Sequence, residues 1–313
     1  MGQNVTGKAL LVIGDAVTDV VALHGSPVMS GTDTAADIVL RPGGSGANTA
    51  AWAARLGADV RLLARLGYDS SAWHTTELIK AGVRPQVTVD PARPTAVVIA
   101  MVDKSGERSM LTNRGAGGLI SEADWSPSLL DGVGRLHLSG YVLFAEPGLR
   151  LARLAMAEAA AAGVAISIDP ASTGPLRDFG VERFMRESSP ANLIIPNLDE
   201  ALLLSGATTA ERAAVLLSEM YGTAVVKLGA KGATAAVDGA VVATAAGVPA
   251  KVVDSTGAGD AFAAGFLTAT LHGVSEEAAL EAGCRAGAEC VARVGGRPRY
   301  GLDLNRLYPI HTD

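Results

Sequence analysis

Apolar and polar positions along this chain fall into two alternating patterns. Short apolar runs, typical of strands buried on both faces, lie at residues 9–13, 60–64, 135–138, 164–168, 192–195 and 224–227. Longer stretches with apolar residues at helical spacing lie at 48–56, 71–80, 149–161, 198–204, 210–220, 261–271 and 276–292. This alternation predicts an α/β fold in which a central, mainly parallel sheet carries helices on both faces.

Two stretches interrupt the alternation because they have strand character and no helix between them. The second contains a polar turn at 103–106 between two apolar runs, which is typical of a β-hairpin. We therefore predict that segments 16–42 and 94–114 form a small β lid that projects from the main body. No repeat or linker divides the sequence, so we expect one domain over residues 1–313.

Charge and composition exclude several kinds of partner. The net charge is −6 and no run of Lys or Arg occurs, so nucleic acids and anionic membranes are not expected partners. No apolar run approaches the roughly 20 residues of a membrane span, and residues 1–8 do not resemble a signal peptide. The cysteines, Cys284 and Cys290, fit neither a disulfide framework nor a metal site, which favours a reducing, cytoplasmic setting.

The segment 254–267, DSTGAGDAFAAGFL, is the most informative part of the chain. Gly257, Ala258 and Gly259 leave backbone N–H groups uncovered just before a helix, and such a helix start binds anions such as phosphate. A carboxylate there is repelled by phosphate unless it accepts a proton from an attacking hydroxyl, which is the role we assign to Asp260. The alternative is a glycine-rich turn in which Asp260 only caps the helix.

A second glycine-rich segment, GGSGAN at 43–48, also precedes a helical pattern. Asn48 offers a donor and an acceptor, which suits a hydroxyl-bearing ligand, although Asn is also a common helix N-cap. Neither segment completes the dinucleotide fingerprint G-x-G-x-x-G, and no P-loop motif is present.

Together, these two segments closely resemble the paired signatures of the ribokinase-like (PfkB-type) carbohydrate kinase family. The resemblance extends over nearly the whole chain. It includes the aspartate of Gly14–Asp19 after the first strand, an N-x-x-E motif at Asn197–Glu200, and the stretch Lys227–Gly232, which is similar to the part of the family that lies along ATP. It implies a three-layer ribokinase-like fold and an ATP-dependent phosphotransferase that acts on a sugar hydroxyl.

The resemblance also implies residue roles. Asp260 would be the catalytic base, and the backbone of Gly257, Ala258, Gly259 and Asp260 would form the anion hole. The sugar would be bound by Asp19, Gly44, Ser45, Asn48 and Arg108, and ATP by Asn197, Lys227, Gly229 and Gly232. Glu200 would organise Mg²⁺ through water, and Asp254 would adjoin a monovalent cation such as K⁺.

For four of these residues the sequence leaves an ordinary alternative open. Asp19 could be a turn residue, Glu200 a solvated acid in a first helical turn, Lys227 a strand end facing water, and Arg108 a solvated lid residue.

The acceptor is not fixed by these motifs. Ser45 stands where ribokinases have Lys, and Val17 where they have a polar residue, so ribose is not assigned. An inward-facing Arg108 or Arg114 would recognise a carboxylate or phosphate, as in ketodeoxygluconate or sugar-phosphate kinases. In a nucleoside kinase of the same fold, Val17, Met29 and Met110 would supply an apolar platform for the base.

Two further alternatives concern activity and assembly. A ligand-binding regulator that has lost catalysis would keep the fold, although the intact motifs argue against it. Members of this family often pair through the lid, and Val39 and residues 97–101 provide apolar β surface for a homodimer.

Overall fold

The computed structural model describes residues 9–103 and 108–299, without the side chain of Arg108. Its larger sheet has nine strands, which are, in spatial order, β13 (Ala240–Ala245), β12 (Ala233–Val237), β11 (Thr223–Lys227), β10 (Leu193–Ile194), β9 (Ala165–Asp169), β8 (Val133–Ser139), β1 (Ala9–Ile13), β4 (Asp59–Gly67) and β5 (Arg84–Asp90). The strands from β11 to β5 pair in parallel, and β12 and β13 add an antiparallel edge. The predicted, mainly parallel sheet is confirmed.

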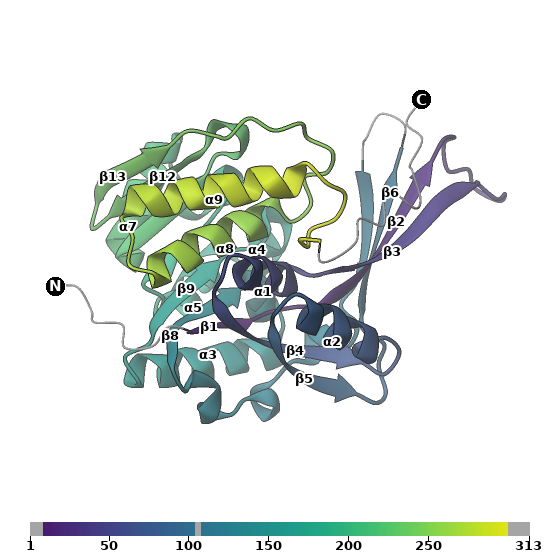
Figure 1. The fold of residues 1–313 in the computed structure, drawn as a ribbon, viewed down its shortest axis with the longest axis horizontal. Coiled ribbons are helices and arrows are strands. Elements are labelled where there is room, and N and C mark those ends of the chain that lie inside the picture. Colours follow the sequence, from purple (N-terminus) through teal and green to yellow (C-terminus); the bar gives the residue numbers. More distant parts are fainter. Residues whose placement is uncertain (1–8, 104–107, 300–313) are drawn as a thin grey trace.

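Helices cover both faces of this sheet (Figure 1). One layer consists of α1 (Ser45–Arg55), α2 (Ser71–Lys80), α8 (Ala258–Leu271) and α9 (Glu276–Val291), and the other of α3 (Glu146–Ala161), α4 (Thr173–Phe179), α5 (Val181–Ser188), α6 (Leu198–Ser205) and α7 (Ala210–Tyr221). The sequence of β1 is apolar throughout because both of its faces are buried: Leu10 and Val12 pack toward α1, and Leu11 and Ile13 pack toward α3. Among the helices described, none is long and apolar enough to cross a bilayer.

The elements that the pattern missed have weak or atypical signals. β12 and β13 are rich in alanine, which has little strand preference, and β5 is an edge strand with a proline, Pro85. Helices α4 and α5 are short and bury few side chains, so they lack a broad apolar stripe. The predicted helices at both glycine-rich segments begin one turn earlier than expected, at Ser45 and Ala258.

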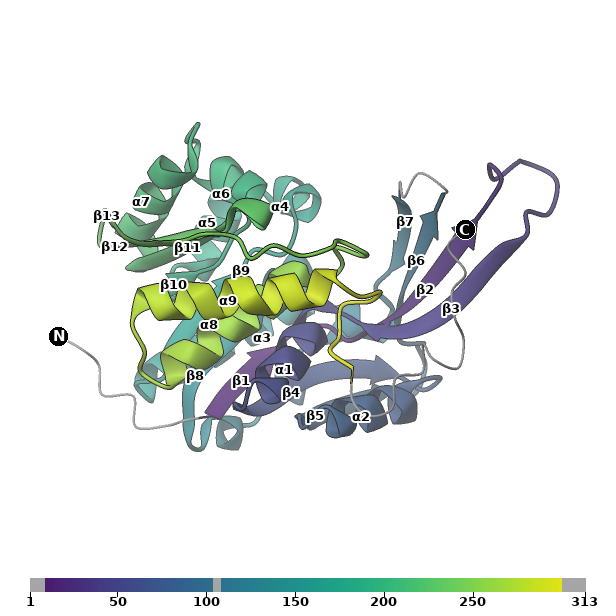
Figure 2. The ribbon, with the colours of Figure 1, turned by 45° about the horizontal axis from the view of Figure 1, so that its top comes forward.

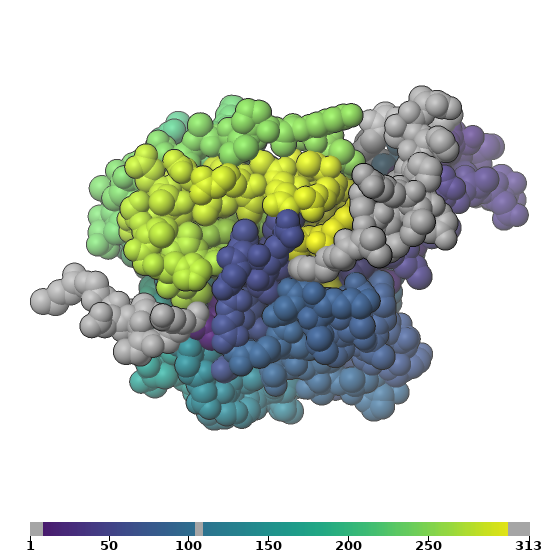
Figure 3. Space-filling model, viewed as in Figure 1, coloured from purple at the N-terminus to yellow at the C-terminus, as the bar shows by residue number. Residues whose placement is uncertain are grey.

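A second sheet stands beyond one end of the body, and we call it the small sheet (Figure 2). It comprises β3 (Ala36–Gly43), β2 (Val17–His24), β6 (Ala96–Val102) and β7 (Arg108–Asn113) in that spatial order, as predicted from the two segments without helices. Figure 3 shows β2 and β3, in purple, reaching past the continuous surface that α1, α2, α8 and α9 form on this side.

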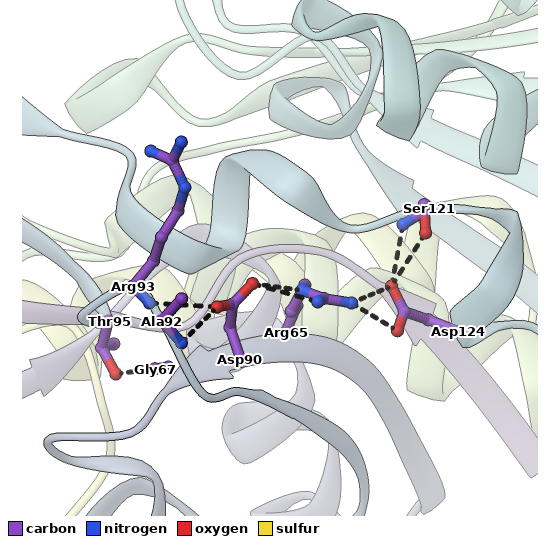
Figure 4. Close-up of polar contacts among 8 residues, drawn as sticks. All are labelled: Arg65, Gly67, Asp90, Ala92, Arg93, Thr95, Ser121 and Asp124. Atoms are coloured by element: carbon purple, nitrogen blue, oxygen red, sulfur yellow. Dashed lines mark hydrogen bonds and ion pairs between the residues drawn. The ribbon is translucent and has the colours of Figure 1, made fainter.

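Arginine and aspartate side chains anchor the small sheet to the body (Figure 4). Arg65 on β4 lies 3.0 Å from Asp90 and 3.0 Å from Asp124, so it joins the end of β5 to the segment between β7 and β8. The other oxygen of Asp90 accepts hydrogen bonds from the N–H groups of Ala92 and Arg93, at 2.9 and 3.0 Å. These bonds shape the segment that leads into β6.

The end of β4 touches the same segment directly. The N–H of Gly67 donates to Thr95 Oγ1 at 2.9 Å, and the N–H of Thr95 donates to Asp69 Oδ1 at 2.8 Å. A Cβ atom on Gly67 would lie 2.1 Å from the backbone nitrogen of Thr95, so no side chain fits at residue 67. The two chain segments are therefore held backbone against backbone at the base of the small sheet.

This contact predicts that Gly67→Ala destabilises the protein, because the added methyl group forces the two backbones apart. We expect a loss of about 1–3 kcal/mol in the free energy of unfolding, measured by urea denaturation. Gly174→Ala is the matched control: a Cβ there meets nothing within 4 Å, and alanine favours the helix. Equal stability of the two variants would contradict the prediction.

Candidate functional site

A cavity of about 1290 Å³ lies between the carboxyl ends of the central strands and the small sheet. In open α/β sheets this edge is where ligands bind. The cavity brings together all the predicted site residues except two: Asp254 lies outside its lining, and the side chain of Arg108 lies outside the described residues. Asp15, Asp169, Arg114 and Tyr141 also line it.

The late glycine-rich segment forms the start of α8. Gly257 adopts a φ of 75°, and a Cβ on it would lie 2.4 Å from the Cα of Gly296, so a glycine is required. Because α8 begins at Ala258, Asp260 lies inside the first turn and the N-cap alternative is wrong. Within the described residues, the N–H groups of Gly257, Gly259 and Asp260 donate no hydrogen bond, whereas that of Ala258 reaches Ser255 O at 3.3 Å.

Two side chains of α1 hold the carboxylate of Asp260. Ser45 Oγ donates to its Oδ1 at 2.8 Å, and Asn48 Nδ2 donates to its Oδ2 at 2.9 Å. Burial raises the pKa of Asp260 to about 6, with repulsion from Asp169 adding to the rise and the bonds from Asn48 and Ser45 opposing it. The carboxylate is therefore a fixed, partly buried proton acceptor at neutral pH.

The first turn of α1 is itself held by Asp15, which follows β1. The Asp15 carboxylate accepts from the N–H groups of Ser45 and Gly46 at 3.3 and 3.2 Å. Since α1 begins at Ser45, Asn48 lies within the helix and is not its N-cap, so that alternative is also wrong. Asp15 was not predicted, although an acidic residue at the carboxyl end of a parallel strand is a usable signal.

The small sheet closes one end of the cavity. Its cross-strand row Arg41, Asp19, Val98 and Thr112 faces inward, since Asp19, Val98 and Thr112 line the cavity. Burial, together with repulsion from Asp15, raises the pKa of Asp19 to about 7.

Apolar and basic side chains complete this end. Val17 and Met110 line the cavity, whereas Met29 is exposed and does not. Arg114 also lines it and donates to the carbonyl oxygen of Tyr141 at 3.3 Å.

The opposite end is reached by Lys227 from β11. Its Nζ lies 2.5 Å from Asp169 Oδ2 at the end of β9, and both side chains are buried, so Lys227 does not simply face water. Gly229 and Gly232 line the same end, and a Cβ on Gly232 would overlap the carbonyl oxygen of Ala245. Asp169 was not predicted, although it occupies the same kind of strand-end position as Asp15.

Asn197 and Glu200 form a reciprocal cap at the start of α6. Glu200 accepts from the N–H and the Nδ2 of Asn197 at 2.9 and 2.6 Å, and the N–H of Glu200 donates to Asn197 Oδ1 at 2.9 Å. Glu200 is 1% exposed, so the solvated alternative is wrong. Burial and the nearby charge of Asp169 raise the pKa of Glu200 to about 7.

Asp254 fixes the loops that adjoin the start of α8. Its carboxylate accepts from the N–H groups of Thr256 and Gly295 at 2.8 and 2.9 Å. The adjoining Gly296 receives a hydrogen bond from Trp52 Nε1 at 2.9 Å. No group of three or more His, Cys, Asp and Glu able to hold a metal occurs among residues 9–103 and 108–299.

A mainly parallel sheet with free helix-start amides beside a partly buried carboxylate is the arrangement expected of a phosphotransferase of the carbohydrate kinase class. Residues 8–299 match the pfkB family carbohydrate kinase description, and the chain belongs to that family. The predicted resemblance and the ribokinase-like fold are thereby confirmed.

Individual relatives agree with this assignment. The chain is 33% identical over 265 residues to the fructokinase of Escherichia coli, with 82% of each chain covered. Its fold matches the crystal structure of adenosine kinase from Sinorhizobium meliloti with a TM-score of 0.84 and 25% identity, covering 93% of this chain and 96% of that one. A protein described as ribokinase II of E. coli, crystallised with ATP and Mg²⁺, matches with a TM-score of 0.83 and 23% identity, covering 94% and 96%.

The geometry predicts the titration of Asp260. In the wild-type protein its carboxyl carbon should titrate by NMR with a midpoint near the pKa of about 6. Ser45→Ala should raise that midpoint, because a hydrogen bond that stabilises the carboxylate is lost. Ser45→Thr keeps a hydroxyl donor and should stay near wild type. An unchanged midpoint in the alanine variant would show that Ser45 does not influence the ionisation of Asp260.

Proposed function

We propose that the protein transfers the γ-phosphoryl group of ATP to a hydroxyl of a small sugar or sugar-like molecule. The observation that carries this proposal is the Asp260 carboxylate, partly buried and held by two hydrogen bonds, which lies in the same helical turn as the free N–H groups that start α8. The fold shared with a protein crystallised with ATP and Mg²⁺ supports the choice of phosphoryl donor.

In this mechanism the acceptor oxygen attacks the γ-phosphorus and forms a new P–O bond. The P–O bond to ADP breaks, ADP leaves with its electron pair, and Asp260 takes the hydroxyl proton. The N–H groups of Gly257, Gly259 and Asp260 stabilise the charge on the moving group, and that of Ala258 joins them by releasing Ser255. The start of α8 therefore stabilises the charge that develops on the phosphoryl group during transfer more than it stabilises bound ATP.

The acceptor would lie between α1 and the small sheet. Asp19, Gly44 and Asn48 offer it hydrogen-bonding groups, while Ser45 acts mainly through Asp260. The small sheet acts as a lid that excludes water, which would otherwise accept the phosphoryl group. Asp15, Asp19 and Asp260 make this end acidic, which favours a neutral, hydroxyl-rich acceptor.

The nucleotide would lie against Asn197, Lys227, Gly229 and Gly232 at the other end. Mg²⁺ fits this end because Glu200 brings carboxylate oxygens to the cavity, and Mg²⁺ bound through water needs few protein ligands. When bound with ATP, Mg²⁺ neutralises phosphate charge. A K⁺ ion near Asp254 and the carbonyl of Thr256 stays a prediction, as does the cytoplasmic location.

A nucleoside is the second candidate acceptor, favoured by the apolar Val17, Val98 and Met110 at the acceptor end. The similarity of the fold to an adenosine kinase agrees with it. A phosphorylation screen with ribose, fructose, ketodeoxygluconate, adenosine and pseudouridine separates the two acceptors. A product from none of them would favour the non-catalytic regulator.

Replacement of the base tests the mechanism. Asp260→Asn keeps the shape but removes the proton acceptor, so kcat should fall about 10²–10⁴-fold or more, measured by ADP release with the best acceptor. ATP binding, followed by calorimetry, should persist. Asp131→Asn, an exposed aspartate remote from the cavity, serves as the control, and a near-wild-type rate for Asp260→Asn would overturn the mechanism.

We further propose a homodimer through the outer face of the small sheet. The row Leu40, Val20, Ile99 and Leu111 crosses all four strands on the side opposite Asp19 and Val98. Leu40 is 61% and Leu111 60% exposed, an apolar surface typical of a protein interface.

Light scattering tests this assembly. At micromolar concentration the wild-type protein should have the mass of two chains, and Leu40→Asp should have the mass of one because it places charge in the interface. Ile79→Asp is the control, since Ile79 is 59% exposed but lies on α2, away from the small sheet. A wild-type monomer would exclude the dimer.

A further inference from the structure

The ion pair of Lys227 with Asp169 is a charged feature of the cavity wall, and the mechanism above gives Lys227 only a place beside the nucleotide and Asp169 no role. The two residues end β11 and β9, and their side chains are 11% and 8% exposed. A buried ion pair of this kind adds little stability compared with well-packed apolar side chains. Its place in the cavity wall therefore suggests a role in the site.

The ammonium group of Lys227 borders the start of α8. A Cβ atom on Gly259 would lie only 3.3 Å from Lys227 Nζ, which is its nearest neighbour outside the adjoining residues and the backbone of α8 itself. Gly259 thus leaves open the space in which the ammonium approaches the free N–H groups of the helix. A larger residue at 259 would separate the lysine from the anion hole.

The charges around Lys227 keep it protonated. Burial alone lowers the pKa of its ammonium group, but the carboxylates of Asp169, Glu200 and Asp260 outweigh burial, and the net shift is upward. In return, the lysine charge opposes the rise in the pKa of Asp260. The Lys227 ammonium therefore stays charged, and its charge favours the ionised form of Asp260.

An incoming phosphate needs such a cation. Asp169, Glu200 and Asp260 would each repel it, and Arg114 and Lys227 are the positively charged residues among those described in the lining. Arg114 contacts Tyr141 at the acceptor side, so Lys227 is the cation at the helix start.

We propose that the Lys227 ammonium binds the transferred phosphoryl group beside the α8 amides, and that Asp169 is the positioning residue that aims it there. This inference rests on the proposed kinase activity. As the P–O bond to ADP breaks and the bond to the acceptor oxygen forms, Lys227 donates hydrogen bonds to the phosphoryl oxygens and keeps its own proton. The acceptor proton goes to Asp260.

Steady-state kinetics of lysine variants test this role. Lys227→Met should lower kcat by roughly 10²–10³-fold with a much smaller change in the KM for ATP, because the interaction strengthens in the transition state. Lys227→Arg keeps the charge and should recover part of the loss. Lys80→Met, an exposed lysine on α2 outside the cavity lining, should match wild type.

A double variant tests the role of Asp169. Asp169→Asn should lower kcat in the wild-type background but cause no further loss in the Lys227→Met background, because its effect passes through the lysine. Lys227→Met could fail to fold because Asp169 is left unpaired. In that case the double variant Asp169→Asn/Lys227→Met, which lacks both charges, is used, and its kcat is compared with that of Asp169→Asn. Melting temperatures report folding.

The outcomes separate the two proposals. Near-wild-type kcat in Lys227→Met, or additive losses in the double variant, would overturn this inference and leave the kinase activity standing. A folded wild-type protein that phosphorylates no acceptor in the panel would overturn the proposed function itself.

Discussion

The pair of hydrogen bonds from α1 to the Asp260 carboxylate is the interaction on which the site depends. A carboxylate placed in a protein interior is costly unless donors satisfy it, and Ser45 and Asn48 supply one donor to each oxygen. These donors come from the first turn of one helix, and their target from the first turn of another, so two helix starts converge on one point. Asp15 fixes the donor side by binding the N–H groups of Ser45 and Gly46.

The rest of the architecture serves this convergence. The parallel strands end at one edge of the larger sheet, and there they present Asp15, Asp169 and Lys227 to a common cavity. The small sheet covers that cavity from the other side with an inward-facing row that includes Asp19, Val98 and Thr112. Its base is held by Arg65 and by the close approach of Gly67 to Thr95, which sets where the lid can lie.

The sequence predicted the parts of this structure whose signals are local. β1 was predicted because it is apolar on both faces, and Asp260 because glycines precede it and a helix follows. β5 was missed because an edge strand is half exposed, and Asp169 because its role arises from a partner, Lys227, brought to it across β10. Lys227 itself was predicted to bind ATP. Its proximity to Gly259 arises because the fold brings the end of β11 to the start of α8, which the spacing of the two residues in the sequence does not show.

The packing of Gly296 against both helix starts has a consequence for biosynthesis. A Cβ on Gly296 would lie 2.5 Å from Asn48 Nδ2, and a Cβ on Gly257 would lie 2.4 Å from the Cα of Gly296. The carbonyl oxygen of Gly296 accepts a hydrogen bond from the indole N–H of Trp52. The site therefore forms only when residues near Asp15 and residues near Gly296 are packed together. These contacts join parts of the chain that are among the farthest apart in the sequence. A nascent chain on the ribosome would remain catalytically silent until almost its entire described length had emerged.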